Sequence, residues 1–216
     1  DLLNYDNPSF LPTLPSGYRI TAGYLIGPGV DLTGADLTEA DLTGVTSGSI
    51  VGTPTLSTEY QITDGYLIGP GVDLTGADLT GLDLTGADLT GADLTGADLT
   101  GADLTSADLT GASLTAVTSG SIVGIPTLPR GTLLVAGYLI GPGVDLRSSD
   151  LAGADLSGAD LTGADLRHSN LTGADLTNAD LSGANLRSTD LTGADLTSAN
   201  LNNINPALIN LSGAIL

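Results

Sequence analysis

The commonest side chain with chemical potential in this sequence is aspartate. Twenty Asp residues each stand directly before one of the leucines that recur every five residues, as in the pentad Ala-Asp-Leu-Thr-Gly. Stacked aspartates could form a cation ladder, but a short carboxylate beside a turn also accepts hydrogen bonds from backbone N–H groups. We expect this turn-capping role and predict no metal site, because the glycine- and aspartate-rich nonapeptide of calcium-binding β-rolls is absent.

A second array is formed by threonine. A Thr follows the leucine in 17 of the pentads, without a gap from Thr75 to Thr115. A regular Thr array on a flat solenoid could order water or bind ice. The neighbouring aspartates would make a poor ice-binding plane, and a β-branched residue also favours extended backbone. We expect solvated threonines and keep a cation- or ice-binding surface as an alternative function.

Three of the five basic residues share a spacing. Arg147, Arg167 and Arg187 are 20 residues apart, which predicts one vertical column if 20 residues make one coil. The column could neutralise Asp145 and Asp165. It could also be an interaction stripe for an acidic neighbour, such as the Asp-rich face of another copy, and both interpretations stay open at this stage.

The sequence offers little material for catalysis or for a cofactor. His168 is the only His and there is no Cys, so a His or Cys metal site has too few ligands. The segment Arg167-His168-Ser169 lacks a nucleophile-elbow motif, and we expect a surface histidine. The Gly-Pro-Gly turns are not followed by a phosphate-loop lysine, since the chain contains no Lys. We therefore predict no catalytic, cofactor-binding or metal-binding residue, and no enzyme activity.

Charge and composition restrict the partners and the setting. With 25 acidic against 5 basic residues, the formal net charge is −20, which disfavours direct binding to nucleic acid phosphates. No apolar window of about 18 residues exists, so we predict no membrane span. The chain starts at Asp1 without Met, which suggests a processed or excised chain. A sequence without Met or Cys resists oxidation, and we expect an extracellular or cell-surface location, with the cytoplasm as the alternative.

The repeat itself predicts the backbone that positions these side chains. The inward-facing apolar residues alternate two and three positions apart, which fits neither a helix nor a regular strand. Glycine at nearly every fifth position costs a helix about 1 kcal/mol each time. A chain that turns a corner every five residues fits instead. Four sides close a square coil, and coils stack through backbone hydrogen bonds about 4.8 Å apart.

This pattern resembles the pentapeptide-repeat family, whose fold is a right-handed quadrilateral β-helix. The resemblance rests on Ala-Asp-Leu-Thr-Gly and near variants, and it implies an all-β solenoid. It places the leucine and the residue two before it inside, and the other three residues outside. The residues it assigns to the core are Leu79, Leu84, Leu89 and Leu94, and those it assigns to the surface are Asp78, Thr80 and Gly81.

Some members of that family resemble B-form DNA in shape and charge and inhibit type II topoisomerases. The acidic chain fits such a DNA-mimic binding module, which we keep as an alternative. The bulky Phe centres and the dimerising C-terminal helix of those relatives are not evident here.

A longer repeat divides the chain. The phrase Gly-Tyr-Leu-Ile-Gly-Pro-Gly-Val-Asp-Leu occurs at 23–32, 65–74 and 137–146. We predict one continuous solenoid in which each cassette begins with a connector, made of short strands, a β-hairpin or an irregular coil that protrudes from the stack. The predicted boundaries are an N-terminal extension or cap at 1–12 and cassettes at 13–54, 55–126 and 127–216.

The two ends of the solenoid are candidate contacts between copies. Open sheet edges invite pairing, and the candidate end-to-end contact residues are Phe10, Leu11, Leu211, Ile215 and Leu216. We therefore predict a structural or assembly protein. We expect self-association end to end or side to side, into an extracellular filament or surface layer.

Overall fold

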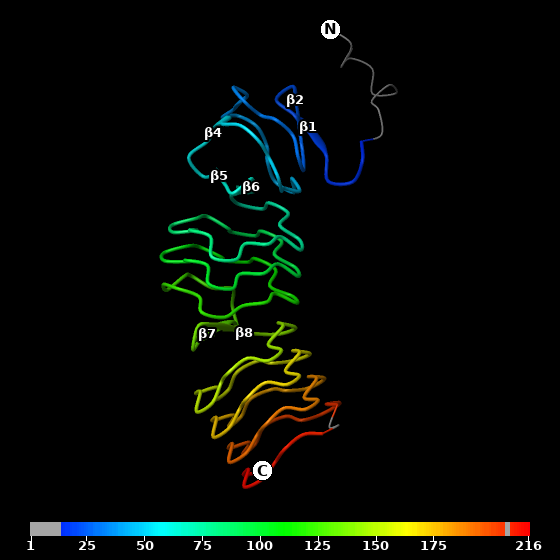
Figure 1. The fold of residues 1–216 in the computed structure, drawn as a ribbon, viewed down its shortest axis with the longest axis vertical. Helices are drawn as coiled ribbons and strands as arrows, with labels where there is room; N and C mark the ends of the chain where they lie inside the picture. Colours follow the sequence, from blue (N-terminus) through cyan, green and yellow to red (C-terminus); the bar gives the residue numbers. More distant parts are fainter. Residues whose placement is uncertain (1–13, 206–207) are drawn as a thin grey trace.

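The computed structural model describes residues 14–205 and 208–216. Within these residues there is no helix, and the backbone winds in coils that stack along the long axis of the molecule (Figure 1). Regular strands are two or three residues long. They are β1 (Arg19–Thr21), β2 (Tyr24–Ile26), β3 (Asp36–Leu37), β4 (Thr55–Leu56), β5 (Gln61–Thr63), β6 (Tyr66–Ile68), β7 (Leu133–Val135) and β8 (Tyr138–Ile140).

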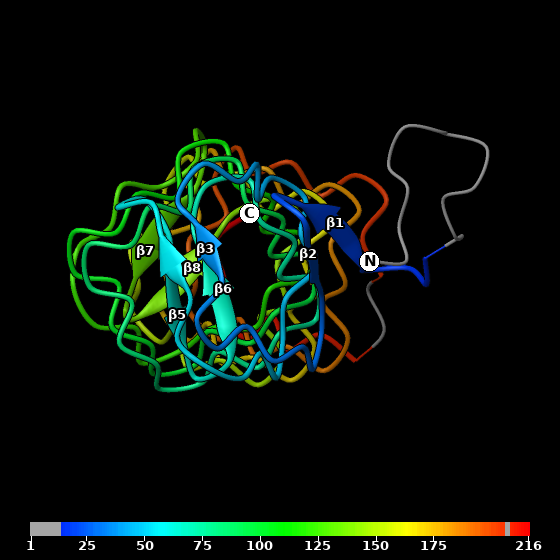
Figure 2. The ribbon, with the colours of Figure 1, turned by 90° about the horizontal axis from the view of Figure 1, so that it is seen from above.

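Residues 20 apart in the pentad runs stack on one another. Asp73 forms a parallel bridge with Asp93. The Leu74 N–H donates to Asp93 O at 2.8 Å, and the Asp93 N–H donates to Val72 O at 2.9 Å. Seen end-on, the coils surround a common axis (Figure 2). In the same way Asp155 pairs with Asp175, which pairs with Asp195, so the predicted stacking period is confirmed.

Each corner is a four-residue turn. In the turn from Leu74 to Ala77, the Ala77 N–H donates to Leu74 O at 3.0 Å, and Gly76 at the third position has a φ of +66°. Positive φ is unfavourable for most L-residues. Glycine adopts it freely, and asparagine adopts it at a lower cost than other non-glycine residues. Asn178 occupies the same place in its turn with a φ of +59°. The corner therefore favours glycine, and other residues that occupy it, such as Ser106 with a φ of +60°, adopt the same positive φ.

Leucine and alanine fill the interior. Leu79, Leu84, Leu89 and Leu94 are each 0% exposed, whereas Asp78, Thr80 and Gly81 lie on the surface. Both predictions are confirmed. Burying one leucine side chain contributes about 1.5–3 kcal/mol, so a stack of such coils can be stable without a large aromatic core.

Three inward-facing positions of the C-terminal part carry hydroxyl groups in place of alanine. Ser149, Ser169 and Thr189 are all buried. The Ser169 and Thr189 hydroxyls both donate to Leu166 O, at 2.7 and 2.8 Å. The Ser149 hydroxyl has no hydrogen-bond partner among the residues that the structure describes.

The connectors are antiparallel β-hairpins. β1 pairs with β2, β5 with β6, and β7 with β8. Across the second and third connectors the bridges join residues 27 apart, Thr46 with Asp73 and Thr118 with Asp145. A hairpin therefore lengthens one coil from 20 to 27 residues, after which the 20-residue stacking resumes.

The prediction that the connectors protrude from the stack is wrong for the second and third hairpins, which pack into the solenoid. In Figure 2, β6 and β8 lie nearer the axis than β5 and β7, and Leu67 and Leu139 are buried. Serines of the preceding coil hold them, because the Leu67 N–H donates to Ser47 Oγ at 3.1 Å and the Leu139 N–H donates to Ser119 Oγ at 3.0 Å. β6 and β8 thus serve as one side of their coils, whereas Leu25, at the equivalent position of β2, is 42% exposed.

The buried residues form two groups that meet at β8. One reaches from Ile26 to Leu139, and the other begins at Ile140. The predicted extension at 1–12, with Phe10 and Leu11, lies outside the described residues.

Candidate functional site

The aspartate array is engaged in the corners of the coils. Asp78 Oδ1 accepts the N–H of Thr80 at 3.1 Å, and Asp108 Oδ1 accepts the N–H of Thr110 at 2.8 Å. The same bond, from the backbone N–H two residues on, recurs in pentad after pentad. These bonds confirm the predicted turn-capping role of the aspartates. Within 14–205 and 208–216, no group of three or more His, Cys, Asp or Glu side chains could hold a metal ion.

The capping bonds also change the acidity of the aspartates. Hydrogen bonds from the side chain and the backbone of Thr80 lower the pKa of Asp78, and those of Thr110 lower the pKa of Asp108. A hydrogen bond to the charged form of a carboxyl favours that form. Each of these corners therefore stabilises a carboxylate anion, which keeps the wall negative.

In the C-terminal part, asparagine interrupts the aspartate columns. Asn170 stacks between Asp150 and Asp190, and its Nδ2 donates to Asp150 Oδ1 at 2.9 Å. Its Oδ1 still caps the corner by accepting the N–H of Thr172 at 3.1 Å. Asn200 and Asn210 repeat the bond between coils, to Asp180 and Asp190.

The three arginines lie on one wall. Bridges join Asp145 to Asp165 and Asp165 to Asn185, so the arginines two residues after each of these form the predicted column. Arg147 contacts Asp145 through Nε at 2.8 Å. Arg167 makes a two-pronged contact with Asp165, at 2.8 and 2.6 Å.

Arg187 differs from the other two arginines. Its backbone N–H donates to Asn185 Oδ1 at 3.3 Å, and its guanidinium forms no ion pair with any residue that the structure describes. Charge neutralisation thus accounts for Arg147 and Arg167, and Arg187 is the one arginine of the column without an acidic partner among the described residues. The role of the column as an interaction stripe stays a prediction.

The single histidine is not part of a catalytic group. His168 is exposed and takes the corner position of its turn, with a φ of +62°. The neighbouring Ser169 is buried and its hydroxyl donates to Leu166 O. A shallow depression of about 430 Å³ lies beside His168, but its arginines are Arg147 and Arg167, which are already paired with aspartates.

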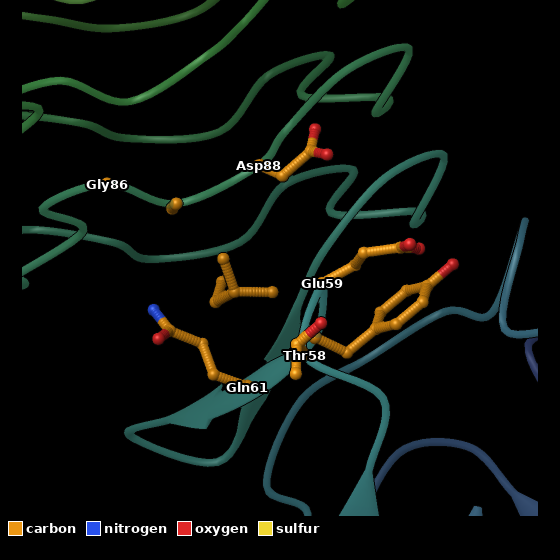
Figure 3. A pocket seen from close by; sticks show the side chains of 8 residues that line it. Thr58, Glu59, Gln61, Gly86 and Asp88 are labelled. Atoms are coloured by element: carbon orange, nitrogen blue, oxygen red, sulfur yellow. The ribbon is translucent and has the colours of Figure 1, made fainter. Parts of the chain in front are cut away.

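A smaller pocket lies beside the second connector. Glu59 and Tyr60 contribute to it from one coil, and Gly86 and Asp88 from the next (Figure 3). Its volume is about 80 Å³, a small fraction of the roughly 300–1,000 Å³ of pockets that hold drug-sized ligands. We assign no ligand to it.

The tyrosines of the connectors make contacts that the sequence analysis did not foresee. Tyr18 donates its hydroxyl hydrogen to Pro28 O at 2.8 Å, and Tyr60 donates to Pro70 O at 3.1 Å. The Tyr66 hydroxyl accepts the N–H of Asp78 at 3.2 Å. The recurrence of Tyr at the same place in two connectors, and its absence from the third, was the available signal.

The last described coil leaves apolar side chains uncovered. Leu211 is 43% exposed, Ile215 55% and Leu216 75%, whereas Leu191 and Leu196, one coil earlier, are each 2% exposed. The predicted contact residues of this end are therefore accessible, and their role in contacts between copies stays a prediction. None of the described residues forms a helix that is long and apolar enough to cross a membrane.

Comparison with solved structures finds other pentapeptide repeat proteins. HetL from the cyanobacterium Nostoc sp. strain PCC 7120, involved in heterocyst differentiation regulation, is 32% identical over 88% of this chain and 86% of its own, with a TM-score of 0.30. A protein of the Arabidopsis thaliana thylakoid lumen is 27% identical over 61% and 63%, with a TM-score of 0.22. The plasmid-mediated fluoroquinolone resistance protein QnrB1 is 16% identical over 66% and 90%, with a TM-score of 0.24. A search of the curated proteins found no match.

The family comparison covers most of the pentad runs. The model described as pentapeptide repeats matches in eight copies, over residues 28–46, 71–105, 83–118, 143–178 and 174–216. These matches cover more than half of the chain, and the all-strand structure fits the right-handed quadrilateral β-helix of this family. The chain belongs to the pentapeptide-repeat family.

Proposed function

We propose that the chain is a non-enzymatic structural protein whose copies associate end to end. The observation that carries this proposal is the exposed apolar edge of the last described coil. Leu211 and Leu216 are inward-facing residues of the repeat that no other coil of the described residues covers, and Ile215 replaces the aspartate found one coil earlier at Asp195. Covering this edge with a coil of a second copy would bury Leu211 and Leu216. Ile215, by contrast, lies at the outward-facing position, where Asp175 stays exposed although a further coil covers it.

The backbone of the same edge supports the proposal. Leu191 donates its N–H to Asn210 O at 2.8 Å, and Leu196 donates to Ile215 O at 2.7 Å. The N–H groups of Leu211 and Leu216 find no such acceptor in the part of the chain that the structure describes. An open edge of this kind is a template for a further strand. A second copy would supply carbonyl acceptors at the same spacing.

The wider proposal is a filament or surface layer outside the cell, with the cytoplasm as the alternative. A chain without Met or Cys suits an oxidising setting. Side-by-side contact would add to end-to-end contact if Arg187, which has no acidic partner within the described part, met an aspartate column of another copy.

Sedimentation velocity over a concentration series, with negative-stain microscopy, tests the end-to-end contact. We expect Leu211→Asp to shift the 216-residue chain from rods of several copies to single copies. Leu133→Asp is the matched control, because Leu133 is also 43% exposed but lies in β7, far from the edge. Single particles of the unchanged chain at the highest attainable concentration would refute the proposal.

A second candidate function is a DNA mimic that inhibits a type II topoisomerase. It is favoured by the run from Asp73 to Thr115, which holds eight Asp and no basic residue. QnrB1, the fluoroquinolone resistance protein, shares the fold but is too distant to lend more than that. Supercoiling by DNA gyrase should fall as the protein is added, and unchanged supercoiling in excess protein would exclude this function.

A further inference from the structure

The third connector lacks an aromatic ring that the other two possess. Tyr18, Tyr60 and Thr132 occupy equivalent positions, each nine residues before the first glycine of a Gly-Pro-Gly turn. The phrase Gly-Tyr-Leu-Ile-Gly-Pro-Gly begins five residues later in all three connectors, so the turn that follows is the same in each. This allows one connector to be compared with another inside a single molecule.

In the first two connectors the ring lies flat against the turn. A Cβ added at Gly27 would come within 2.6 Å of Tyr18 Cδ1, and one added at Gly69 would overlap the Tyr60 ring. The hydroxyl of each tyrosine donates to the carbonyl of the proline that follows the glycine. Burial raises the pKa of Tyr60, with Thr43 close enough to interact with its hydroxyl. The turn thus holds the phenol group of the tyrosine by contact of the ring with the first glycine and by one hydrogen bond to the proline carbonyl.

In the third connector the same place is an open pocket of about 230 Å³. Its lining includes Ser113 and Thr115 from one coil, Thr132 itself, and Gly141 and Pro142 from the turn. Thr115 corresponds to Thr43, which lies beside Tyr60. The pocket is therefore the counterpart of the space that the Tyr60 ring occupies.

The groups that would receive a ring are present and unused. The Pro142 carbonyl accepts no hydrogen bond from any described residue, and Pro142 is exposed whereas Pro28 and Pro70 are half-buried. Gly141 is retained although no ring lies against it, since the nearest atom to an added Cβ would be Thr132 Oγ1 at 3.1 Å. An acceptor remains where the tyrosine is missing, and the smaller Thr132 side chain covers Gly141 in place of the ring.

We propose that this pocket binds a small para-substituted phenol from solution. The ring would lie in the pocket beside Thr132 and the Gly141-Pro142 turn, and its hydroxyl would donate to Pro142 O. The para substituent would point toward the open mouth of the pocket, because Thr132 has its own Cβ where the tyrosine Cβ stands in the other connectors. Ser113 occupies the position in the third connector that Asp41 occupies beside Tyr60. The pocket therefore has no carboxylate at this position that would repel an ionised or electron-rich phenol.

Titration with p-cresol, followed by amide NMR shifts, tests the proposal directly. We expect saturable shifts at Gly141, Gly143 and Thr115 with one site and a Kd on the order of 1 mM, as suits a ligand of few atoms. Toluene, which has the same shape without the hydroxyl, should bind at least several-fold more weakly because it leaves Pro142 O unpaired. Equal binding of the two compounds, or the absence of shifts at these residues, would overturn the assignment.

Two variants locate the site. Thr132→Tyr should fill the pocket, abolish the p-cresol shifts and raise Tm by about 2–4 °C, whereas Thr132→Ser should leave binding intact. Shifts that persist in Thr132→Tyr would place the ligand elsewhere and refute the proposal. The reverse change, Tyr60→Thr, should create a second site, so that two equivalents of p-cresol bind and restore part of the lost thermal stability.

A tyrosine side chain of a second copy is the competing occupant. If it filled the pocket, the unchanged chain would dimerise in the absence of phenols, and Thr132→Tyr would abolish the dimer. That result would overturn a free phenol as the occupant. Because this dimer would not depend on Leu211, the outcome is distinct from failure of the end-to-end association proposed above.

Discussion

The middle pentad run, residues 71–118, and the C-terminal run, residues 143–216, share a backbone but differ in what covers it. In both runs the central leucines up to Leu196 are buried, and the coils stack every 20 residues. The middle run pairs Asp with Asp from coil to coil and has no basic residue between Asp73 and Thr115. The C-terminal run keeps one all-aspartate column at Asp155, Asp175 and Asp195, alternates Asp with Asn in another, at Asp150, Asn170 and Asp190, and adds the arginine column.

The difference between the outer walls of the two runs shows which side-chain properties the coil requires and which it can vary. Every corner needs an oxygen acceptor before the leucine, and the Oδ1 atoms of Asp98 and Asn170 both provide it. Only asparagine can also donate to the coil next to it. The negative charge of the middle run is therefore not needed for the fold, which makes it available for solubility or for binding a basic partner.

The largest expected effect concerns the core that the two runs share. Leu99→Ala in the middle run and Leu176→Ala in the C-terminal run each remove a side chain that is 0% exposed, which costs about 2–5 kcal/mol of unfolding free energy. Urea denaturation should show losses of similar size. A much smaller loss in one run would mean that the two cores are not equivalent, and the contrast would no longer be confined to the surface.

Acid should separate the corners capped by aspartate, which prevail in the middle run, from those capped by asparagine, which occur in the C-terminal run. The folded-state pKa of Asp108 lies below the ordinary 3.8, so the unfolded chain binds its proton first. Its contribution to stability is fully present above pH 3.8 and is lost as the pH falls through the lower folded value. The Thr110 amide, which donates to Asp108, should shift in an NMR titration below pH 3.8.

The internal control for the acid titration is the Thr172 amide. It donates to Asn170, which has no carboxyl group to titrate, so its shift should not follow the same curve. Equal titration of the two amides would contradict the capping role of the carboxylate.

A single exchange at Asp98 tests whether asparagine is the better residue in a column. Asp98→Ala removes the acceptor of the Thr100 N–H and should cost about 0.5–1.5 kcal/mol. Asp98→Asn keeps that acceptor, and its amide could donate to Asp78, which lies one coil away. We expect Asp98→Asn to match or exceed the stability of the unchanged chain.

The converse exchange, Asn170→Asp, removes the bond to Asp150 and places three carboxylates in one column. It should lower stability by somewhat under 1 kcal/mol per repelling pair, and added salt should reduce the loss. Stability of Asp98→Asn below that of Asp98→Ala, or no loss in Asn170→Asp, would show that the columns do not interact in this way.

The sequence predicted the parts of the molecule that repeat. Leu79 and Leu94 could be assigned to the core because five-residue spacing and stacking leave them no other place. The capping role of Asp78 also followed from its place beside a turn. The contacts of the connectors could not be predicted, because Tyr60 reaches Pro70 and Ser47 reaches Leu67 only once a hairpin replaces a side of the coil. The bond from Asn170 to Asp150 was missed because asparagine had been treated as an ordinary variant of the pentad.

The smallest expected effect concerns the buried hydroxyls that distinguish the C-terminal core from the alanine-lined middle core. Ser149 is buried, and its hydroxyl has no partner among the described residues. Because a buried polar group without a hydrogen bond is destabilising, Ser149→Ala should raise the unfolding free energy, by about 1 kcal/mol. Ser169→Ala is the matched control, since it removes a hydroxyl that donates to Leu166 O at 2.7 Å, and it should gain little or lose stability. A loss in Ser149→Ala as large as that in Ser169→Ala would mean that the Ser149 hydroxyl is satisfied, for instance by a bound water, and that the two cores differ less than their residues suggest.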